Sequence, residues 1–405
     1  MRFRGLMAGL AGLALALQGQ AALASSAPPE APGCSIFPAD NVWNADISSL
    51  PVDGHSAQWL ASMNAGSKLL HPDFGRPPYG MPWTAVDASH PKVNVSFDYA
   101  DESDPGPYPF DGSTPIEGGQ DAGGDRHAIM LDKDACKLYE LYDARWNGGA
   151  PTAGSGAIFD LRSDALRPST WTSADAAGLP IFPGLIRYDE VAAGAITHAI
   201  RFTAHATDKR FIWPARHQAG SRSDPSLPPM GARFRLKANF DASGYSPQAR
   251  AVITAMQHYG LILADNGSDW FFQGTEDSRW SDDLLDQLKR IPASQFEAID
   301  ESSLMVDPNS AAVKGGAPAA ANANCAYILG FATLHDLLPG VIGGCLDNQA
   351  FAANGDAVQH STGGLLVWRK ADNWTAFTDG YRTWVNGPLG MQQRLNTERF
   401  SWERA

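Results

Sequence analysis

Alternating apolar and polar positions recur along much of the chain and predict β-strands. Residues 92–99 alternate in this way, and a period of two places every second side chain on one face of a strand. Two segments rich in β-formers, 127–131 and 137–142, flank a short charged turn and predict a hairpin. Residues 196–202 and 232–236 predict two more strands.

Helical signals are fewer. The dipeptide Ser246-Pro247 supplies an N-cap and a proline at the first helical position, and it predicts a helix over residues 247–259. Ser281 predicts the start of another helix, and a short one is expected near Ser173. The pattern as a whole predicts a mainly-β fold. We expect a β-sandwich or jelly-roll-like large domain with a few helices, plus a small disulfide-closed α+β C-terminal domain.

The N-terminus has the three parts of a secretory signal peptide. Arg2 and Arg4 give a basic start, residues 5–17 are apolar, and Ala22-Leu23-Ala24 is a small-residue cleavage site. The apolar run is too short to span a membrane, and no later stretch reaches about 18 apolar residues. We therefore expect cleavage after residue 24, a secreted or periplasmic mature protein, and no transmembrane anchor.

Composition divides the chain into segments. After the signal peptide (1–24), residues 25–33 form a leader of Pro, Ala and Ser. Residues 34–304 are expected to form the large β domain. Most of residues 305–324 are Ala, Gly, Pro or Asn, which is typical of a linker. Residues 325–405 are expected to form a small accessory domain.

Charge limits the classes of partner. The 405 residues include 44 Asp and Glu against 31 Lys and Arg, a net charge of −13 at pH 7. Loss of Arg2 and Arg4 with the signal peptide makes the mature chain more acidic still. Binding to a phosphate backbone needs clustered Lys and Arg, so the charge excludes a nucleic-acid partner. The same charge disfavours an acidic polysaccharide.

Four cysteines in an exported chain indicate two disulfide bonds. Three pairings are open to four cysteines. Position along the chain favours Cys34–Cys136 and Cys325–Cys345, one in each domain. No two cysteines form a C-x-x-C pair, so zinc and thioredoxin chemistry are not expected.

Several long segments resemble a large domain of exported bacterial proteins. They include GGDRHAIMLDKDACKLYELYDA (123–144), GSGAIFDLRSDALRP (154–168) and AGLPIFPGLIRYDEVAAG (177–194). Near the C-terminus, GGLLVWRKADNWTAFTDGYRTWVNGP resembles a module appended to other exported bacterial proteins. The resemblance implies an exported protein of several domains and assigns no catalytic residue.

Candidate catalytic carboxylates lie near the ends of predicted elements. Asp160 follows an apolar segment, Asp265 ends the apolar run 261–264, and Glu190 lies in a short predicted helix. Glycoside hydrolysis uses two carboxyl groups, one as a proton donor and one as a base or nucleophile. We therefore expect catalytic residues among Asp160, Glu190 and Asp265, although no pair has a diagnostic spacing. Asp265 also fits an ordinary turn.

His127 and His198 are the candidate catalytic bases. His127 stands at the start of a predicted strand, near loops of the kind that often host sites. His198 shares an apolar strand face and needs a polar partner there. Each also fits a structural role as a hydrogen-bonded histidine. With Tyr188 and Arg187 or Arg201, the histidines would suit a polysaccharide lyase, which needs a base and a cation beside a uronate.

Aromatic and basic residues near strand ends are candidate contacts for substrate. Trp213 ends an aromatic strand and would stack on a sugar ring, with Arg216 and His217 at its rim. Tyr188 and Trp270 complete the expected substrate-binding set. A core position fits Trp213 equally well.

Two acidic loops are candidate calcium sites, because Ca²⁺ takes several oxygen ligands from flexible loops. One loop carries Asp98, Asp101, Glu102 and Asp104, and the other carries Asp121 and Asp125. Neither matches the twelve-residue EF-hand loop. A solvated loop is the stronger interpretation, so calcium is an option and no cofactor is required.

These observations favour an exported carbohydrate-active protein that cleaves a polysaccharide as a glycoside hydrolase does, with a C-terminal accessory binding module. The expected partner is a polysaccharide or a cell-surface glycan. Two alternatives stay open: a non-catalytic glycan-binding protein of the cell envelope, and a polysaccharide lyase. The chain has no G-x-S-x-G, H-E-x-x-H or Walker motif, so the chemistries of those motifs are not expected.

Overall fold

The structure is a computed structural model, and it confirms the mainly-β class. It describes residues 27–314, 325–345, 347–352, 354–361, 364–378, 382–395 and 398–403. With 28% strand and 17% helix, sheets dominate and helices are few. The predicted signal peptide and residues 315–324 of the predicted linker lie outside the described residues.

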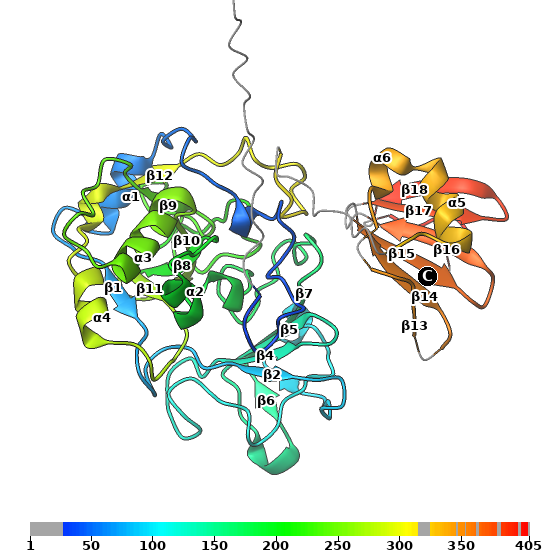
Figure 1. Cartoon of the computed structure of the whole chain (residues 1–405), viewed down its shortest axis with the longest axis horizontal. Coiled ribbons are helices and arrows are strands. Elements are labelled where there is room, and N and C mark those ends of the chain that lie inside the picture. The colour runs from blue at the N-terminus through cyan, green and yellow to red at the C-terminus, as the bar shows by residue number, and fades with distance from the viewer. Residues whose placement is uncertain are drawn as a thin grey trace, which may run out of the picture.

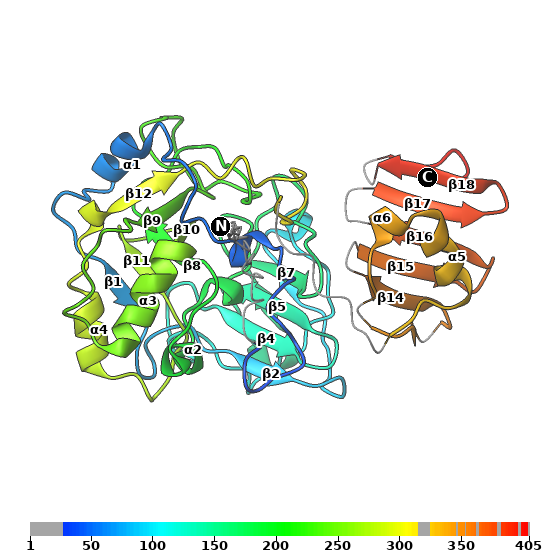
Figure 2. The same cartoon turned by 45° about the horizontal axis from the view of Figure 1, so that its top comes forward.

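The largest sheet has six strands in the order β1-β11-β8-β10-β9-β12 (Figures 1 and 2). Its strands are β1 (His71–Asp73), β8 (Ile200–Ala204), β9 (Arg233–Leu236), β10 (Leu261–Asn266), β11 (Phe271–Gln273) and β12 (Phe296–Ile299). The sheet is mixed, because β10 pairs in parallel with β8 and antiparallel with β9. The strand expected at residues 196–202 begins only at Ile200, so His198 lies in the segment before it.

A second sheet has four strands in the order β2-β4-β5-β7. Its strands are β2 (Thr84–Val86), β4 (Ala128–Asp132), β5 (Lys137–Tyr142) and β7 (Ser155–Asp160), and β3 (Ser96–Phe97) pairs separately with β6 (Thr152–Ala153). The predicted hairpin is confirmed as the antiparallel pair β4 and β5. Every residue of β4 is buried, because Ile129 and Leu131 face one hydrophobic cluster while Ala128 and Met130 face another.

Four α-helices belong to the large domain: α1 (Ser56–Ser62), α2 (Tyr188–Ala193), α3 (Pro247–His258) and α4 (Asp282–Leu288). Three of them, α1, α3 and α4, contact strands of the six-stranded sheet, and α2 packs against α3. Both predicted N-caps are confirmed, because the hydroxyl of Ser246 accepts from the Ala249 amide and that of Ser281 from the Leu284 amide. Short 3₁₀ helices lie at Val42–Asn44, Ala100–Glu102, Asn147–Gly149, Phe182–Gly184 and Ala293–Gln295.

The helix expected near Ser173 is absent, and residues 171–180 form turns instead. The Ser173 hydroxyl contacts the carbonyl oxygens of Asp175 and Leu179, and Gly178 has a φ of 68°. Such side chain–backbone contacts compete with the helical hydrogen-bond ladder. This segment is therefore a loop where a short helix was expected.

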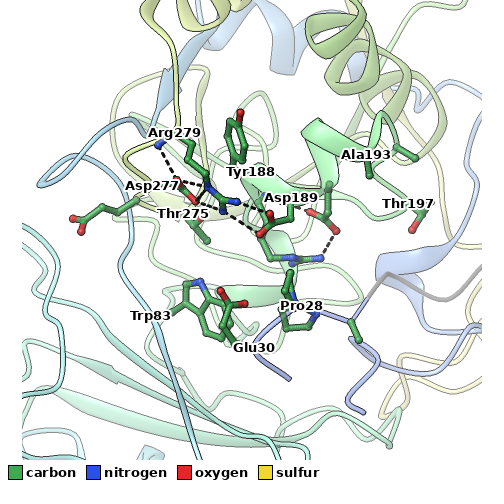
Figure 3. Close-up of a pocket in the computed structure, with 16 residues that line it drawn as sticks. Pro28, Glu30, Trp83, Tyr188, Asp189, Ala193, Thr197, Thr275, Asp277 and Arg279 are labelled. Carbon is green, nitrogen blue, oxygen red and sulfur yellow. Dashed lines mark hydrogen bonds and ion pairs between the residues drawn. The ribbon is translucent and has the colours of Figure 1, made fainter. Parts of the chain in front are cut away.

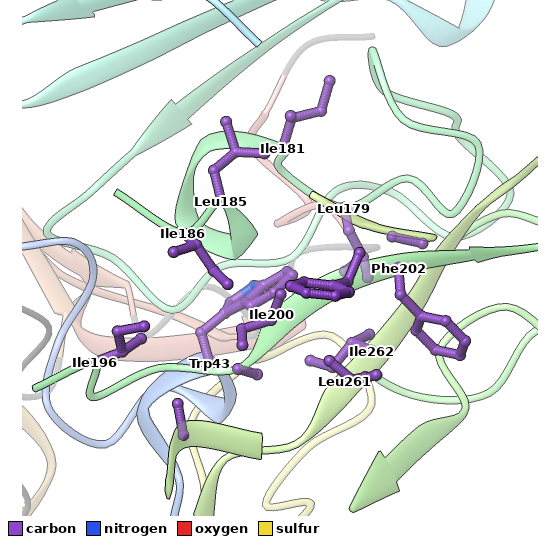
Figure 4. Packing of buried hydrophobic residues seen from close by; sticks show 14 of the residues in the cluster. Trp43, Leu179, Ile181, Leu185, Ile186, Ile196, Ile200, Phe202, Leu261 and Ile262 are labelled. Carbon is purple, nitrogen blue, oxygen red and sulfur yellow. The ribbon is translucent and has the colours of Figure 1, made fainter. Parts of the chain in front are cut away.

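The main core packs around β8 and β10. Figure 4 shows Trp43, from the N-terminal segment, among aliphatic side chains that include Ile200 and Ile262. Trp43 is 2% exposed, and its carbonyl oxygen accepts from the Ala199 amide at 2.7 Å. This contact joins the N-terminal segment to the start of β8, and so fixes the strand that carries Arg201.

Residues 305–314 lie against the large domain rather than in a free linker. The amide of Val42 donates to the Ala311 carbonyl oxygen at 2.7 Å, and the amide of Val313 donates to the Asp40 carbonyl oxygen at 2.8 Å. Backbone groups can form such bonds whatever the side chains are, so the small-residue composition did not reveal them.

The C-terminal region, coloured orange to red in Figure 1, forms its own six-stranded antiparallel sheet. Its elements are α5 (Leu329–Leu337), α6 (Pro339–Ile342), β13 (Ala350–Phe351), β14 (Ala357–Ser361), β15 (Gly364–Arg369), β16 (Trp374–Thr378), β17 (Arg382–Gly387) and β18 (Gly390–Leu395). Phe331 and Leu334 of α5 pack with Leu366, Phe377 and Trp384 on one face of the sheet.

Both expected disulfides, Cys34–Cys136 and Cys325–Cys345, are present. The first joins residues 102 apart in the sequence and ties the N-terminal segment to the β4–β5 hairpin. The second closes a segment that includes α5 and α6. Across the residues that the structure describes, none of the helices has the length and hydropathy needed to cross a membrane.

Candidate functional site

A cavity of about 480 Å³ lies where the ends of strands from the two sheets meet, and we call it the acidic cavity. The walls come from segments far apart in the chain and are rich in carboxylates and hydroxyls. The lining residues are Tyr99, Glu102, Asp125, Tyr142, Ser155, Thr172, Ser173, Ala174, Asp175, Ala176, His217, Ala219, Asp265 and Asn266.

Asp265 lies near the end of β10, at an irregularity in the sheet. The pairing of β10 with β8 shifts register between Leu263 and Asp265, and such a bulge redirects the side chains beside it. The Asp265 carboxylate accepts from the Asn266 amide at 2.7 Å. Its side chain keeps 20% of its surface exposed, so it is reachable from the cavity.

Arg201 of β8 lies beneath the cavity and is fully buried. Its Nε and Nη2 donate to the two carboxylate oxygens of Asp175 at 3.0 and 2.8 Å, a bidentate arrangement typical of strong ion pairs. Its Nη1 donates to Gln273. The same Nη2 lies 3.7 Å from Asp265 Oδ2, so Arg201 connects the two aspartates.

The pKa values of the two aspartates are raised. Burial, together with the negative charge of Asp175, raises the pKa of Asp265 to about 7, against the opposing effect of Arg201 and His127. Burial also raises the pKa of Asp175, despite its bonds to Arg201. Carboxyl groups that keep their protons near neutral pH are typical of general acids, and strongly perturbed groups in a cavity are candidate functional groups.

His127 supports the cavity from behind. Its Nδ1 lies 2.7 Å from Glu117 Oε2 and its Nε2 lies 3.1 Å from the carbonyl oxygen of Ala174. Burial opposes the charged ring, but the Glu117 carboxylate raises the pKa of His127 to about 9. Both ring nitrogens therefore donate at neutral pH, and the protonated ring holds Ala174, which lines the cavity.

A rim of hydrogen bonds fixes the turn segment 171–180 in place. The Ala177 amide donates to the Ala264 carbonyl oxygen at 2.9 Å, next to Asp265, and the Thr172 amide donates to Glu102 Oε2 at 3.0 Å. His217 Nδ1 lies 2.9 Å from the Ala176 carbonyl oxygen. These bonds hold the segment that contains Asp175, and so they place its carboxylate beside Arg201.

Two of the predicted catalytic residues, Asp265 and His127, meet at this cavity, and the predicted substrate contact His217 joins them at its rim. Glu190 and Tyr188 line a different pocket of about 430 Å³, shown in Figure 3. The sequence-predicted residues are thus divided between two pockets.

The pocket in Figure 3 has charged groups that pair with one another. Glu190 binds Arg187 and lies 3.2 Å from His198 Nε2. Burial opposes the charged form of Glu190, but the charge of Arg187 and the hydrogen bond with His198 hold its pKa below the usual range. Arg279 bridges Asp189 and Asp277 (Figure 3) and stacks over the ring of Tyr188 at 4.4 Å. These pairs suit a structural network better than proton transfer.

The other predicted site residues lie elsewhere. Trp270 is completely buried among aromatic rings of the core, and its indole nitrogen donates to the Met63 carbonyl oxygen. Trp213 donates to the Ser310 carbonyl oxygen. Arg216 is buried and donates to the carbonyl oxygen of Arg167 at 2.7 Å. Asp160 ends β7, and its Oδ2 lies 3.8 Å from His360 Nε2 of the C-terminal region.

The candidate calcium loops have other partners in the structure. Asp104 binds Arg167 and accepts from the Ile158 amide at 2.9 Å, while Glu102 and Asp125 line the acidic cavity. Within the described ranges, no three His, Cys, Asp or Glu side chains are grouped closely enough to hold a metal ion.

Four residues at or behind the cavity were not expected from the sequence: Asp175, Glu117, Tyr99 and Tyr142. Asp175 lies in a loop with no local signal for chemistry, far in sequence from its partner Arg201. One signal was available: an arginine inside an apolar strand must find an anion when it is buried. That signal predicts a partner for Arg201 but does not say which carboxylate it is.

Fold and site together define a mainly-β protein whose carboxylates gather in a cavity between two sheets. Comparisons with models of protein families, with curated proteins and with solved structures found no match to this chain.

Proposed function

We propose that this protein is an exported enzyme that hydrolyses a glycan in the acidic cavity, with Asp265 as the proton donor. The observation that carries the proposal is the carboxyl group of Asp265, which is reachable from a cavity of about 480 Å³ and has its pKa raised to about 7. A general acid of this kind holds its proton near neutral pH and releases it to a leaving group.

The proposed reaction needs two carboxyl groups. Asp265 gives its proton to the glycosidic oxygen as the bond from that oxygen to the anomeric carbon breaks. A water molecule adds its oxygen to the anomeric carbon, and its proton passes to a second carboxylate. Glu102 and Asp125 are the candidates for that role, because both line the cavity and are at least partly exposed.

Hydrolysis fits the cavity better than elimination from a uronate. A lyase needs a cation that neutralises the substrate carboxylate, and among the residues that the structure describes no Lys or Arg lines the cavity. Arg201 beneath it is fully buried and already binds Asp175 and Gln273. A uronate would therefore enter a cavity of carboxylates without a free cation to meet it.

The C-terminal region supports an accessory role in glycan binding. Helices α5 and α6 cover one face of its sheet, and a hollow of about 450 Å³ borders Trp374 and Trp402. The two indole rings meet edge to face with centroids 4.6 Å apart. Aromatic rings offer apolar faces to the C–H groups of sugars, and we assign this hollow to a polysaccharide or cell-surface glycan.

Export is part of the proposal. The predicted signal peptide indicates a secreted or periplasmic location. The two disulfide bonds support it, because such bonds persist in oxidising compartments.

The test is mass spectrometry of soluble products after incubation of the mature protein with a panel of polysaccharides. We expect saturated oligosaccharides from the wild type and none from Asp265→Asn. The matched control is Asp241→Asn, because Asp241 is exposed in a turn outside the cavity and accepts from the nearby Ser243 amide. Unsaturated products, or unchanged cleavage by Asp265→Asn, would overturn the proposal. Binding without any product would favour the non-catalytic alternative.

A further inference from the structure

The walls of the acidic cavity carry an excess of negative charge. Four of the lining side chains are carboxyl groups, Glu102, Asp125, Asp175 and Asp265. Asp265 keeps its proton near neutral pH and Asp175 is paired with Arg201, so the uncompensated negative charge comes from Glu102 and Asp125. Among the described residues that line the cavity, His217 is the one basic side chain. The described part of the chain places neither Lys nor Arg in the lining of the cavity. The field inside the cavity therefore attracts cations and repels anions.

The cations near the cavity are already neutralised by protein groups. Arg201 is bound by Asp175 through two hydrogen bonds, and its third donor group binds Gln273. His127 is paired with Glu117. Neither group is exposed, so neither can compensate the carboxylates at the cavity surface.

Two of the carboxylates are placed to meet a ligand. Asp125 is exposed. The Glu102 side chain keeps 33% of its surface exposed, although its Oε2 accepts from the Thr172 amide at 3.0 Å and lies 3.8 Å from His217 Nε2. An ammonium group offers three hydrogen-bond donors that suit such acceptors. Tyr99 is 54% exposed and lines the cavity together with Tyr142. Aromatic faces bind both sugar C–H groups and cations.

The same charge does not point to a metal ion. A hard cation such as Ca²⁺ needs several oxygen ligands at one point. In the part of the chain that the structure describes, no three acidic or metal-binding side chains converge in this way. The carboxylates are instead spread over a cavity large enough for a sugar unit.

We propose that the acidic cavity binds glycans that carry free amino groups, such as chains of glucosamine, in preference to N-acetylated or uronic glycans. The ammonium groups are held by Glu102 and Asp125, and Tyr99 packs against a sugar ring. This inference rests on the proposed function for its choice of a glycan as ligand, but it concerns binding and is tested by binding.

The experiment measures the affinity of the full-length mature protein for the β-1,4-linked tetramer of glucosamine and for its fully N-acetylated form. Calorimetry at pH 6 and at two salt concentrations is suitable. We expect the glucosamine tetramer to bind at least about tenfold more tightly at low salt, and the preference to shrink at high salt because salt screens exposed charges.

Matched variants separate the cavity charges from the general charge of the protein. Glu102→Gln and Asp125→Asn are each expected to weaken binding of the glucosamine tetramer about threefold to tenfold, with little effect on the N-acetylated tetramer. Asp101→Asn and Asp121→Asn remove exposed charges that neighbour these two residues in sequence but do not line the cavity. We expect no effect from these controls.

The outcomes distinguish this inference from the proposed function. Equal affinity for the two tetramers, tighter binding of the acetylated form, or no binding of either would overturn the preference for amino groups. Cleavage of neutral glycans alone would preserve the hydrolase and contradict the inference. Selective binding of the glucosamine tetramer without cleavage would support the inference and leave the proposed hydrolysis unsupported.

Discussion

Replacement of Asp265 by Asn is expected to stabilise the folded protein at neutral pH while it abolishes cleavage. The folded state raises the pKa of Asp265 to about 7 because the carboxyl group is buried beside Asp175. In the unfolded chain the same group ionises near pH 4. Folding must therefore keep a proton on Asp265 or bury a charge, and either costs free energy that Asn does not incur.

The magnitude follows from the difference between the two pKa values. A rise from about 3.9 to about 7 is about three units, and at about 1.4 kcal/mol per unit the upper limit is about 4 kcal/mol. Asp265 keeps 20% of its side chain exposed and loses its contact with Arg201 when replaced. We therefore expect a gain of about 1–3 kcal/mol in the free energy of unfolding.

The stability difference between Asp265→Asn and the wild type should depend on pH in a defined direction. Below about pH 4 Asp265 is protonated in both states, so the variant gains nothing. Between about pH 4 and 7 the unfolded state loses the proton and the folded state keeps it, so the wild type loses stability as pH rises. Above about pH 7 both states are ionised and the difference is constant. The advantage of Asp265→Asn should grow over this window only.

Denaturant unfolding followed by tryptophan fluorescence measures the effect, because Trp43 and Trp270 are buried in the large domain. The wild type, Asp265→Asn and the control Asp241→Asn are compared at pH 4, 5.5, 7 and 8. The control group is exposed, and the Ser243 contacts lower its pKa, so this variant should show no such gain. A gain for Asp265→Asn that is independent of pH, or a loss at pH 7, would refute the raised pKa.

Three further predictions follow from other parts of the structure. Cys34→Ser combined with Cys136→Ser opens a loop of 102 residues and should cost about 4–5 kcal/mol of unfolding free energy on the loop-entropy relation, seen as a lower denaturant midpoint. Glu190→Gln removes the carboxylate that pairs with buried Arg187 and His198. It should lower the free energy of unfolding by about 3 kcal/mol while glycan cleavage stays within about twofold of the wild type. A complete loss of cleavage in a folded variant would instead place the active site in the pocket of Figure 3. Cleavage at saturating substrate should fall as pH rises above about 7, because Asp265 then loses the proton that it donates, and an activity that still increases at pH 9 would exclude it as the acid.

Local signals in the sequence predicted local structure. The Ser246 cap, the β4–β5 hairpin and both disulfides are present as expected. The cap and the hairpin depend on residues that are neighbours in sequence, and the disulfides depend on a choice among three possible pairings of four cysteines. The helix expected near Ser173 failed because the serine hydroxyl bonds to backbone carbonyls within a turn. Residue type alone does not decide between a cap and a turn.

These local signals did not predict the order of strands in the large sheet. β8 lies between β11 and β10, and β1 lies at the edge beside β11. Pairings of this kind join segments that are far apart in the chain, and alternation of apolar residues says only that a strand has a buried face. For the same reason the sequence did not predict the cavity, since its walls come from the ends of strands in two separate sheets.

The chemistry of Asp265 is set by a segment that carries no motif. The turn segment 171–180 is bound to β10 by the hydrogen bond from the Ala177 amide to the Ala264 carbonyl oxygen. This bond places Asp175 where it accepts from Arg201. Without Asp175, the charge of Arg201 would act on Asp265 unopposed and lower its pKa. A sequence change in this turn can therefore alter the pKa of Asp265, the proposed proton donor, without replacing it. Position at a strand end made Asp265 a candidate, but its acidity depends on a partner ninety residues away in sequence.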